Sequence, residues 1–200
     1  MKVKNISNCA VKSVVPLTEA GRKLLDSECI NPKCLPVNVC SVDVLCLNKL
    51  CHGIGVSNRF WGMAFFSHDE AIKGLVNIEP VEVLRFNFPK QVKYTSCCVF
   101  ADLLDYFSYL TLVKEPEGRN LPKICDCFVM NHVCNYLAVM YDTTNYAYIH
   151  LMFPRTFIGK TMEKTFVSRC PSRVVVHSSF YKGFDSLHDY LKSIKTTNQL

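Results

Sequence analysis

Cysteine is the residue that most restricts how this chain can fold and where it can work. The chain has 12 cysteines in 200 residues, and five of them fall between Cys29 and Cys51. In a secreted protein this density would predict a disulfide framework. Residues 1–9, however, contain no continuous apolar run of the kind that a signal peptide carries. We therefore expect a reducing, cytoplasmic environment in which most thiols are free, as buried apolar groups, metal ligands or nucleophiles.

The composition predicts a globular chain with a substantial core. Hydrophobic residues make up 49% of the sequence and charged residues 20%, which argues against a disordered chain. No segment approaches the roughly 20 consecutive apolar residues of a membrane-spanning helix, so we expect no membrane span. The length fits a single compact domain over 1–200. The polar stretch 114–123, which contains two prolines and a glycine, marks the place of a possible subdivision.

Periodicity and turn residues predict the α+β class. Apolar residues at helical spacing, together with favourable N-caps, predict helices over 18–27, 68–76, 100–110 and 184–194. Alternating apolar residues predict strands over 84–88, 92–96, 135–141, 146–153, 165–169 and 173–180, and an extended buried segment within 29–51. Residues 142–145 carry a hairpin signature between two of these strands. The expected architecture is a mixed or antiparallel sheet with three to four helices packed on it.

Two groups of cysteines are candidates for a metal site. The cysteines between Cys29 and Cys51 are separated by four or five residues and include no compact pair, whereas structural zinc normally uses close pairs of ligands. A second group has shorter spacing but only one residue between its first two members; it comprises Cys125, Cys127, His132 and Cys134. The sequence therefore predicts no metal and no other cofactor. If a zinc ion is bound, the second group is the candidate.

A cysteine–histidine pair is the enzymatic alternative. Cys98 precedes the helix predicted over 100–110, and a helix N-terminus lowers the pKa of a thiol. Histidines 132, 150 and 177 are candidates for its base. Cys51 and His52 are adjacent, and neighbouring residues along an extended chain point in opposite directions.

Two short motifs carry only part of a known site. The segment 177–179, His-Ser-Ser, resembles half of the paired signature of two-histidine phosphodiesterases, and no second copy follows another histidine. The segment 159–161, Gly-Lys-Thr, resembles the end of a phosphate-binding P-loop, but Pro154 stands where that motif requires its first glycine. Neither motif predicts a function by itself.

The only tryptophan lies in the sequence Asn-Arg-Phe-Trp-Gly over 58–62. Arg59, Phe60 and Trp61 are residue types that often anchor a protein partner. The alternative is that these aromatic side chains belong to the core. We take the three residues as the candidate binding site.

The residue usage carries a further resemblance. Valine, phenylalanine, tyrosine and cysteine are frequent, whereas glutamine occurs only at positions 91 and 199. The frequent residues have codons rich in U, and in this respect the chain resembles nonstructural and accessory proteins of coronaviruses and other nidoviruses. No motif of these proteins is matched, so no functional residue is carried over. The resemblance implies a viral protein that acts on a host factor, in innate immunity or gene expression.

The sequence as a whole favours a cytoplasmic protein that works by binding a host protein. A hydrolase with a cysteine–histidine pair is the first alternative. RNA binding is the second, because the net charge is +6, but the lysines and arginines are scattered rather than gathered in one run.

Overall fold

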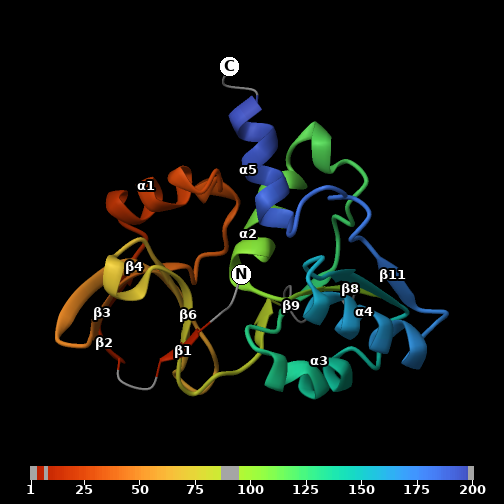
Figure 1. Cartoon of the computed structure of the whole chain (residues 1–200), viewed down its shortest axis with the longest axis horizontal. Coiled ribbons are helices and arrows are strands. Elements are labelled where there is room, and N and C mark those ends of the chain that lie inside the picture. Colours follow the sequence, from red (N-terminus) through yellow and green to blue (C-terminus); the bar gives the residue numbers. More distant parts are fainter. Residues whose placement is uncertain (1–3, 7–8, 87–94, 198–200) are drawn as a thin grey trace. The chain divides into compact units, whose positions relative to one another are not determined.

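The computed structural model describes residues 4–6, 9–86 and 95–197. The chain forms two compact units, Met1–Leu84 and Arg85–Leu200 (Figure 1). This differs from the expected single unit with a possible division at 114–123. That stretch lies inside the second unit, where its Leu121 is buried. The expected α+β class is confirmed, since helices accompany two separate sheets.

The first unit is built on a six-stranded sheet with the order β1-β6-β5-β4-β3-β2. Its strands are β1 (Lys4–Ile6), β2 (Cys9–Pro16), β3 (Cys40–Cys46), β4 (Lys49–Ser57), β5 (Met63–Ser67) and β6 (Gly74–Ile78). Neighbours from β2 to β6 pair antiparallel, and β1 pairs parallel with β6. Helix α1 (Glu19–Ser27) begins at Thr18, whose hydroxyl accepts a hydrogen bond from the Gly21 N–H, as the sequence predicted.

The two faces of this first sheet have different roles. Val42 and Val44 of β3 and Cys51 of β4 belong to a buried apolar cluster around Phe65. Because side chains alternate along a strand, the residues between them point to the opposite face, where α1 contacts β3 and β4. That second face carries the polar network described below.

The second unit contains a five-stranded sheet with the order β11-β10-β8-β9-β7. Its strands are β7 (Leu84–Phe86, at the boundary of the units), β8 (Ser96–Phe100), β9 (Asp126–Val129), β10 (Tyr148–Met152) and β11 (Val174–Val176). Its helices are α2 (Leu103–Leu112), α3 (Tyr136–Asp142), α4 (Phe157–Arg169) and α5 (Leu187–Thr197). The pairs β8–β9, β8–β10 and β10–β11 are parallel.

Parallel strands begin at the same edge of the sheet, so each pair needs a crossover connection. Helix α2 links β8 to β9, α3 links β9 to β10, and α4 links β10 to β11. The chain moves first to one side of β8 and then to the other, and right-handed crossovers then place α2 on one face and α3 and α4 on the other. Accordingly α2 packs with α5 (Figure 1). Helices α3 and α4 are in contact, since the rings of Tyr136 and Phe166 pack edge to face with their centres 5.2 Å apart.

Helix α2 is the most deeply buried helix segment of the second unit. Asp102 caps it by accepting hydrogen bonds from the N–H groups of Leu104 and Asp105. Nine of its ten residues are buried, which is more than the single apolar stripe that the sequence predicted. Phe100 ends β8 instead of opening the helix, and Leu110 is only partly buried.

Three of the predicted elements are wrong. The segment 135–141 forms α3, and 165–169 is the end of α4, so the predicted hairpin at 142–145 does not exist. The aromatic and β-branched residues of 135–141 and 165–169 are typical of strands. Both segments, however, lie in crossover connections between parallel strands, and such connections are usually helical. The segment 68–76 forms a short 3₁₀ turn at Glu70–Ile72 and then enters β6. There the Ser67 hydroxyl accepts the Asp69 N–H, and Gly74 adopts φ +102° to start the strand.

The other predicted elements are found with shifted ends. Helices α1, α2 and α5 correspond to 18–27, 100–110 and 184–194, and β7, β10 and a shortened β11 correspond to 84–88, 146–153 and 173–180. The extended segment within 29–51 contains β3. The strand expected over 92–96 falls mostly outside the described residues.

Candidate functional site

The tight turn between β4 and β5 carries the three residues selected from the sequence. We call residues 58–62 the aromatic tip. The Asn58 N–H donates to the Gly62 carbonyl at 2.7 Å, and the Asn58 side chain accepts hydrogen bonds from the N–H groups of Phe60 and Gly62. The same side chain donates to the Pro80 carbonyl at 2.6 Å. A Cβ atom at position 62 would lie 1.8 Å from the Pro80 oxygen, so only glycine fits. These contacts fix the turn.

The side chains of the aromatic tip lie at the surface. Trp61 is 87% exposed and Phe60 is 55% exposed. Arg59 donates two hydrogen bonds to the carboxylate of Glu82, at 2.9 and 2.7 Å, and its guanidinium carbon lies 4.7 Å from the centre of the Phe60 ring. The sequence left open whether these aromatic residues belong to the core. The structure places them outside it.

Trp61 has a strained backbone as well as an exposed side chain. Its φ of +68° lies in the left-handed region, which a bulky residue rarely occupies. Such strain persists only where the surrounding contacts impose it, and it is found most often at functional positions. The hydrogen bonds of Asn58 supply these contacts.

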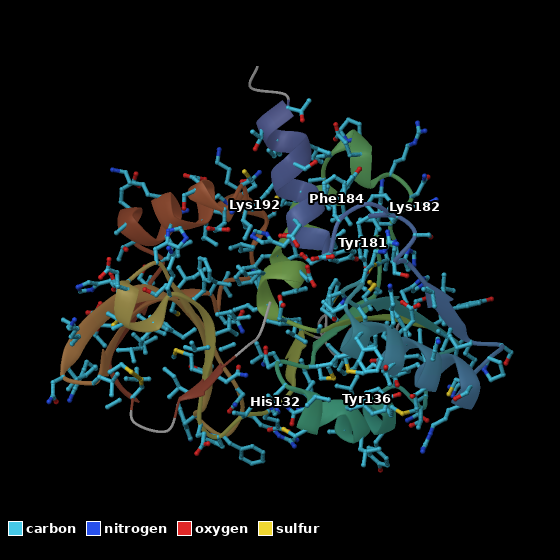
Figure 2. All side chains as sticks on the ribbon, in the orientation of Figure 1. His132, Tyr136, Tyr181, Lys182, Phe184 and Lys192 are labelled. Carbon is cyan, nitrogen blue, oxygen red and sulfur yellow. A yellow bond between two sulfur atoms is a disulfide. The ribbon has the colours of Figure 1, made fainter. Side chains whose placement is uncertain are left out.

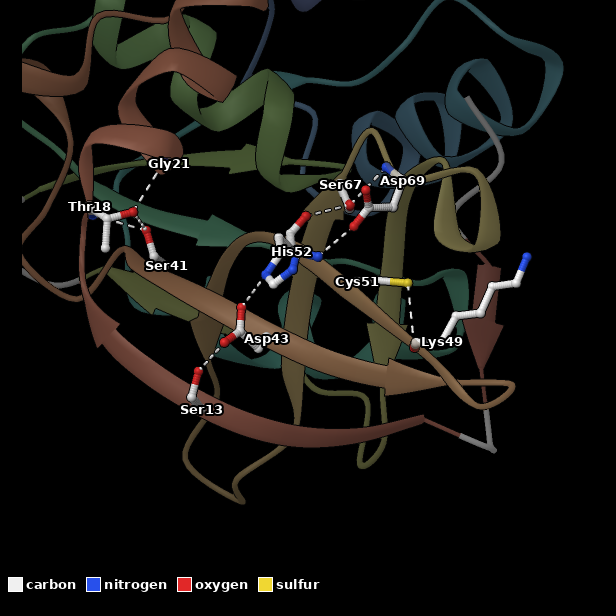
Figure 3. A network of polar contacts seen from close by, with 10 residues as sticks. All are labelled: Ser13, Thr18, Gly21, Ser41, Asp43, Lys49, Cys51, His52, Ser67 and Asp69. Carbon is white, nitrogen blue, oxygen red and sulfur yellow. Dashed lines mark hydrogen bonds and ion pairs between the residues drawn. The ribbon is translucent and has the colours of Figure 1, made fainter.

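A polar network lies on the α1 side of the first sheet (Figure 3). The His52 ring is held at Nδ1 by Asp43, at 2.6 Å, and the Ser13 hydroxyl donates to the other oxygen of Asp43 at 2.7 Å. Hydrogen bonds from Ser13 and His52 lower the pKa of the Asp43 carboxyl. The His52 backbone N–H donates to Asp69, and its carbonyl accepts from the Ser67 hydroxyl. His52 is therefore fixed through both its ring and its backbone.

The network borders a cavity of about 300 Å³. His68 also lines it and is hydrogen-bonded through Nε2 to the Glu28 carboxylate at 2.7 Å. Because Asp43 occupies Nδ1 of His52, the Nε2 atom is the ring nitrogen left to form a hydrogen bond with a bound molecule. Cys51 is buried on the opposite face, as expected for neighbours on a strand, so it cannot act with His52.

Three other thiols gather in the core of the second unit. The sulfur of Cys98 lies 3.3 Å from that of Cys125, and the Tyr109 hydroxyl lies 3.2 Å from the same Cys125 sulfur. Burial raises the pKa of Cys98, so the low thiol pKa expected from the helix N-terminus is wrong. Hydrogen bonds from the thiols of Cys127 and Cys98 lower the pKa of Cys125. All three cysteines are buried, which keeps any substrate away from them.

The candidate zinc ligands do not come together. Cys125 and Cys127 are buried in the thiol cluster, whereas Cys134 is exposed. His132 uses Nδ1 to accept the Cys134 N–H at 3.2 Å. Within the ranges that the structure describes, no group of three or more potential ligands could hold a metal ion.

The cysteines divide into unbonded thiols and one bonded pair. Ten cysteines are free. Cys9 and Cys46, which face each other on β2 and β3, form a disulfide.

The comparisons with known proteins add no relative. Searches with protein-family models, against curated proteins and against solved structures gave no match. In the described part of the chain, no helix has the length and apolarity needed to cross a membrane.

Proposed function

We propose that this chain is a protein-binding module that anchors its partner through the aromatic tip. The observation that carries this proposal is the position of Trp61: the only tryptophan of the chain is 87% exposed on a turn that backbone and side-chain hydrogen bonds hold in place. An exposed tryptophan that packs into a pocket of a partner buries a large apolar area.

The rigidity of the aromatic tip favours tight binding. A partner that binds a fixed turn pays little conformational entropy, and tryptophan and arginine are the residue types most enriched among dominant interface residues. Arg59 is already oriented by Glu82 and covers Phe60, so this side chain also needs little ordering. The proposed partner surface is an apolar pocket with an acidic or polar rim.

The identity of the partner is proposed from composition. The resemblance to nonstructural and accessory proteins of nidoviruses supports a viral protein that binds a host protein in the cytoplasm. The geometry favours this proposal over a cysteine hydrolase, because Cys98 is buried and its pKa is raised. No observation on the aromatic tip favours RNA binding.

The test uses affinity purification from host-cell extract with the full chain as bait. Wild type is compared with Trp61→Ala, and Phe157→Ala is the matched control, since Phe157 is an aromatic residue of the second unit that is 86% exposed. The expected result is a protein recovered with wild type and with Phe157→Ala but lost with Trp61→Ala. Equal recovery with all three baits would contradict the proposal.

A second readout uses the tryptophan itself. Because Trp61 is the only tryptophan, its emission reports directly on the aromatic tip. Iodide should quench the free protein efficiently, and the purified partner should protect Trp61 and shift its emission to shorter wavelength. Unchanged quenching in a complex that survives gel filtration would place the interface elsewhere.

A further inference from the structure

The second unit has a cavity at the edge of the sheet where ligands bind in parallel α/β structures. Strands β9, β8, β10 and β11 are parallel. In open parallel sheets, ligands bind outside the carboxyl ends of the strands. A cavity of about 360 Å³ lies beside the loops that follow β10 and β11.

The cavity is lined by four cations from three segments of the chain. Its walls contain one residue before α4, three residues of α4 and three residues that follow β11; these are Arg155, Lys160, Glu163, Lys164, Ser178, Ser179 and Lys182. Lys182 lies on the segment that leads from β11 toward α5 (Figure 2). Glu163 is the one carboxylate of the lining.

These cations are not neutralised by the protein. Across the described ranges, no ion pair joins Arg155, Lys160, Lys164 or Lys182 to a carboxylate. Like charges around one cavity repel each other, and a bound anion removes this repulsion. The hydroxyl groups of Ser178 and Ser179 add hydrogen-bond donors of the kind that phosphate oxygens accept.

The walls of the cavity are tied to one another. The hydroxyl of the buried Tyr181 donates to the Phe153 carbonyl at 2.6 Å, and the Arg155 N–H donates to the Asp185 carbonyl at 2.7 Å. These two hydrogen bonds join the segment after β11 to the β10–α4 loop. The backbone segments that carry these cations are therefore joined before any ligand arrives.

The Gly-Lys-Thr segment singled out in the sequence lies at this cavity. Lys160 is in the first turn of α4, directly after a strand and a short loop, which is the structural context of a phosphate-binding lysine. A Cβ atom at Gly159 would lie 1.9 Å from the Pro154 carbonyl oxygen, so this glycine lets the helix start close to the loop. The loop lacks the glycine cradle of a P-loop, so the side chains must supply most of the contacts.

We propose that this cavity binds the phosphate group of a small phosphomonoester. Arg155, Lys160, Lys164 and Lys182 neutralise the dianion, and Ser178 and Ser179 donate to its oxygens. A volume of about 360 Å³ is in the range of small-molecule pockets. The cations converge on one cavity rather than forming a stripe, which fits a single phosphate better than a nucleic-acid backbone. The proposal is independent of the aromatic tip and shares no residue with it.

The test is isothermal titration calorimetry, in which the full chain is titrated with inorganic phosphate and, separately, with adenosine monophosphate. Saturable binding of both is expected. Lys160→Gln and Arg155→Gln should each weaken binding about tenfold, the loss expected for one charge-assisted hydrogen bond. The control Lys73→Gln removes an exposed lysine of the first unit and should leave affinity unchanged. Melting temperatures of all variants verify that they are folded.

Glu163→Gln gives a test of opposite sign. Removing the one carboxylate of the lining should tighten phosphate binding several-fold, which a merely structural residue would not do. Absence of saturable binding by wild type at ~10 mM phosphate would overturn the proposal, since that corresponds to a free energy weaker than about −3 kcal/mol. It would also be overturned if Lys73→Gln lost as much affinity as Lys160→Gln. A single-stranded RNA that binds with length-dependent, salt-sensitive affinity, while both small phosphates fail, would assign the cations to nucleic acid instead.

Discussion

His150 and His177 share a hydrogen bond of 2.9 Å between Nδ1 of the first ring and Nε2 of the second. The residues are 27 positions apart in the chain and meet because β10 and β11 are parallel neighbours. The sequence showed only half of a two-histidine pattern at 177–179. The structure places His150 beside His177. The motif could not reveal this, because His150 is followed by Leu151 and Met152 and not by the serine or threonine of the pattern.

This pair predicts an acid-sensitive fold. Burial and the neighbouring His150 lower the pKa of His177 to about 4, and burial lowers the pKa of His150. The unfolded chain takes up protons near the ordinary value of 6.5, whereas the folded chain resists them. The contribution of the neutral histidine pair to the free energy of unfolding should therefore be fully present above pH 6.5. It should decrease as the pH falls from 6.5 toward 4.

The measurement is the free energy of unfolding in urea at several pH values between 7 and 4.5. In His177→Gln, the free energy of unfolding should decrease less between pH 7 and pH 4.5 than in wild type. The control is His132→Gln, which changes a partly exposed histidine outside the pair and should show the same decrease as wild type. An unchanged decline in His177→Gln would assign the acid sensitivity to other groups.

Truncation of α2 should be costly. Leu104 is 2% exposed in a helix of which nine residues are buried, so Leu104→Ala should lower the free energy of unfolding by about 2–5 kcal/mol. Leu137→Ala on α3 is the matched control, because Leu137 is 67% exposed; its effect should stay within about 0.5 kcal/mol. Equal losses in the two variants in denaturant melts would contradict the burial of α2.

Two substitutions of Trp61 separate its backbone strain from its side chain. Glycine tolerates φ +68° and alanine does not, so Trp61→Gly should be more stable than Trp61→Ala by about 1 kcal/mol. Both variants lose the same exposed ring, which makes them mutual controls. Denaturant melts in which Trp61→Ala is the more stable variant would show that the turn relaxes when the ring is removed.

Alkylation of the native protein should distinguish the thiols by position. The exposed Cys134 should react first with iodoacetamide, and the buried Cys97, Cys98 and Cys127 last. Mass spectrometry after unfolding without reductant should find ten modified cysteines, and the remaining two in the Cys9–Cys46 disulfide. Rapid native labelling of Cys98 would show that the thiol cluster opens to solvent.

The elements that could be predicted are those whose signals are local. Thr18 caps α1 and the apolar spacing of 103–107 marks α2, because caps and helical periodicity act within a few residues. The segments 135–141 and 165–169 were misassigned because their residue types suit a strand, whereas the parallel pairings of β8 with β10 and of β10 with β11 require crossover connections there. Only tertiary context decides between the two.

For the aromatic tip and the cavity around Lys160, local signals were again readable from the sequence, whereas features that depend on tertiary contacts were not. Arg59, Phe60 and Trp61 could be selected by residue type, but their exposure depends on the hydrogen bonds of Asn58, which no pattern reveals. The cavity around Lys160 could not be predicted, because its lining comes from three segments, and the one after β11 meets the other two only through the crossover that follows β10.

The different topologies of the two sheets imply different folding times. In the first unit, β3, β4, β5 and β6 are neighbours both in sequence and in the sheet, so they can form as successive hairpins. Strands β1 and β2 have more distant partners, with Lys4 opposite Val76 and Pro16 opposite Cys40. In the second unit, each described parallel pair closes over an entire helix and its loops. Chains dominated by such distant contacts fold more slowly. During synthesis the hairpins of the first unit therefore have time to form while the second unit is still emerging from the ribosome.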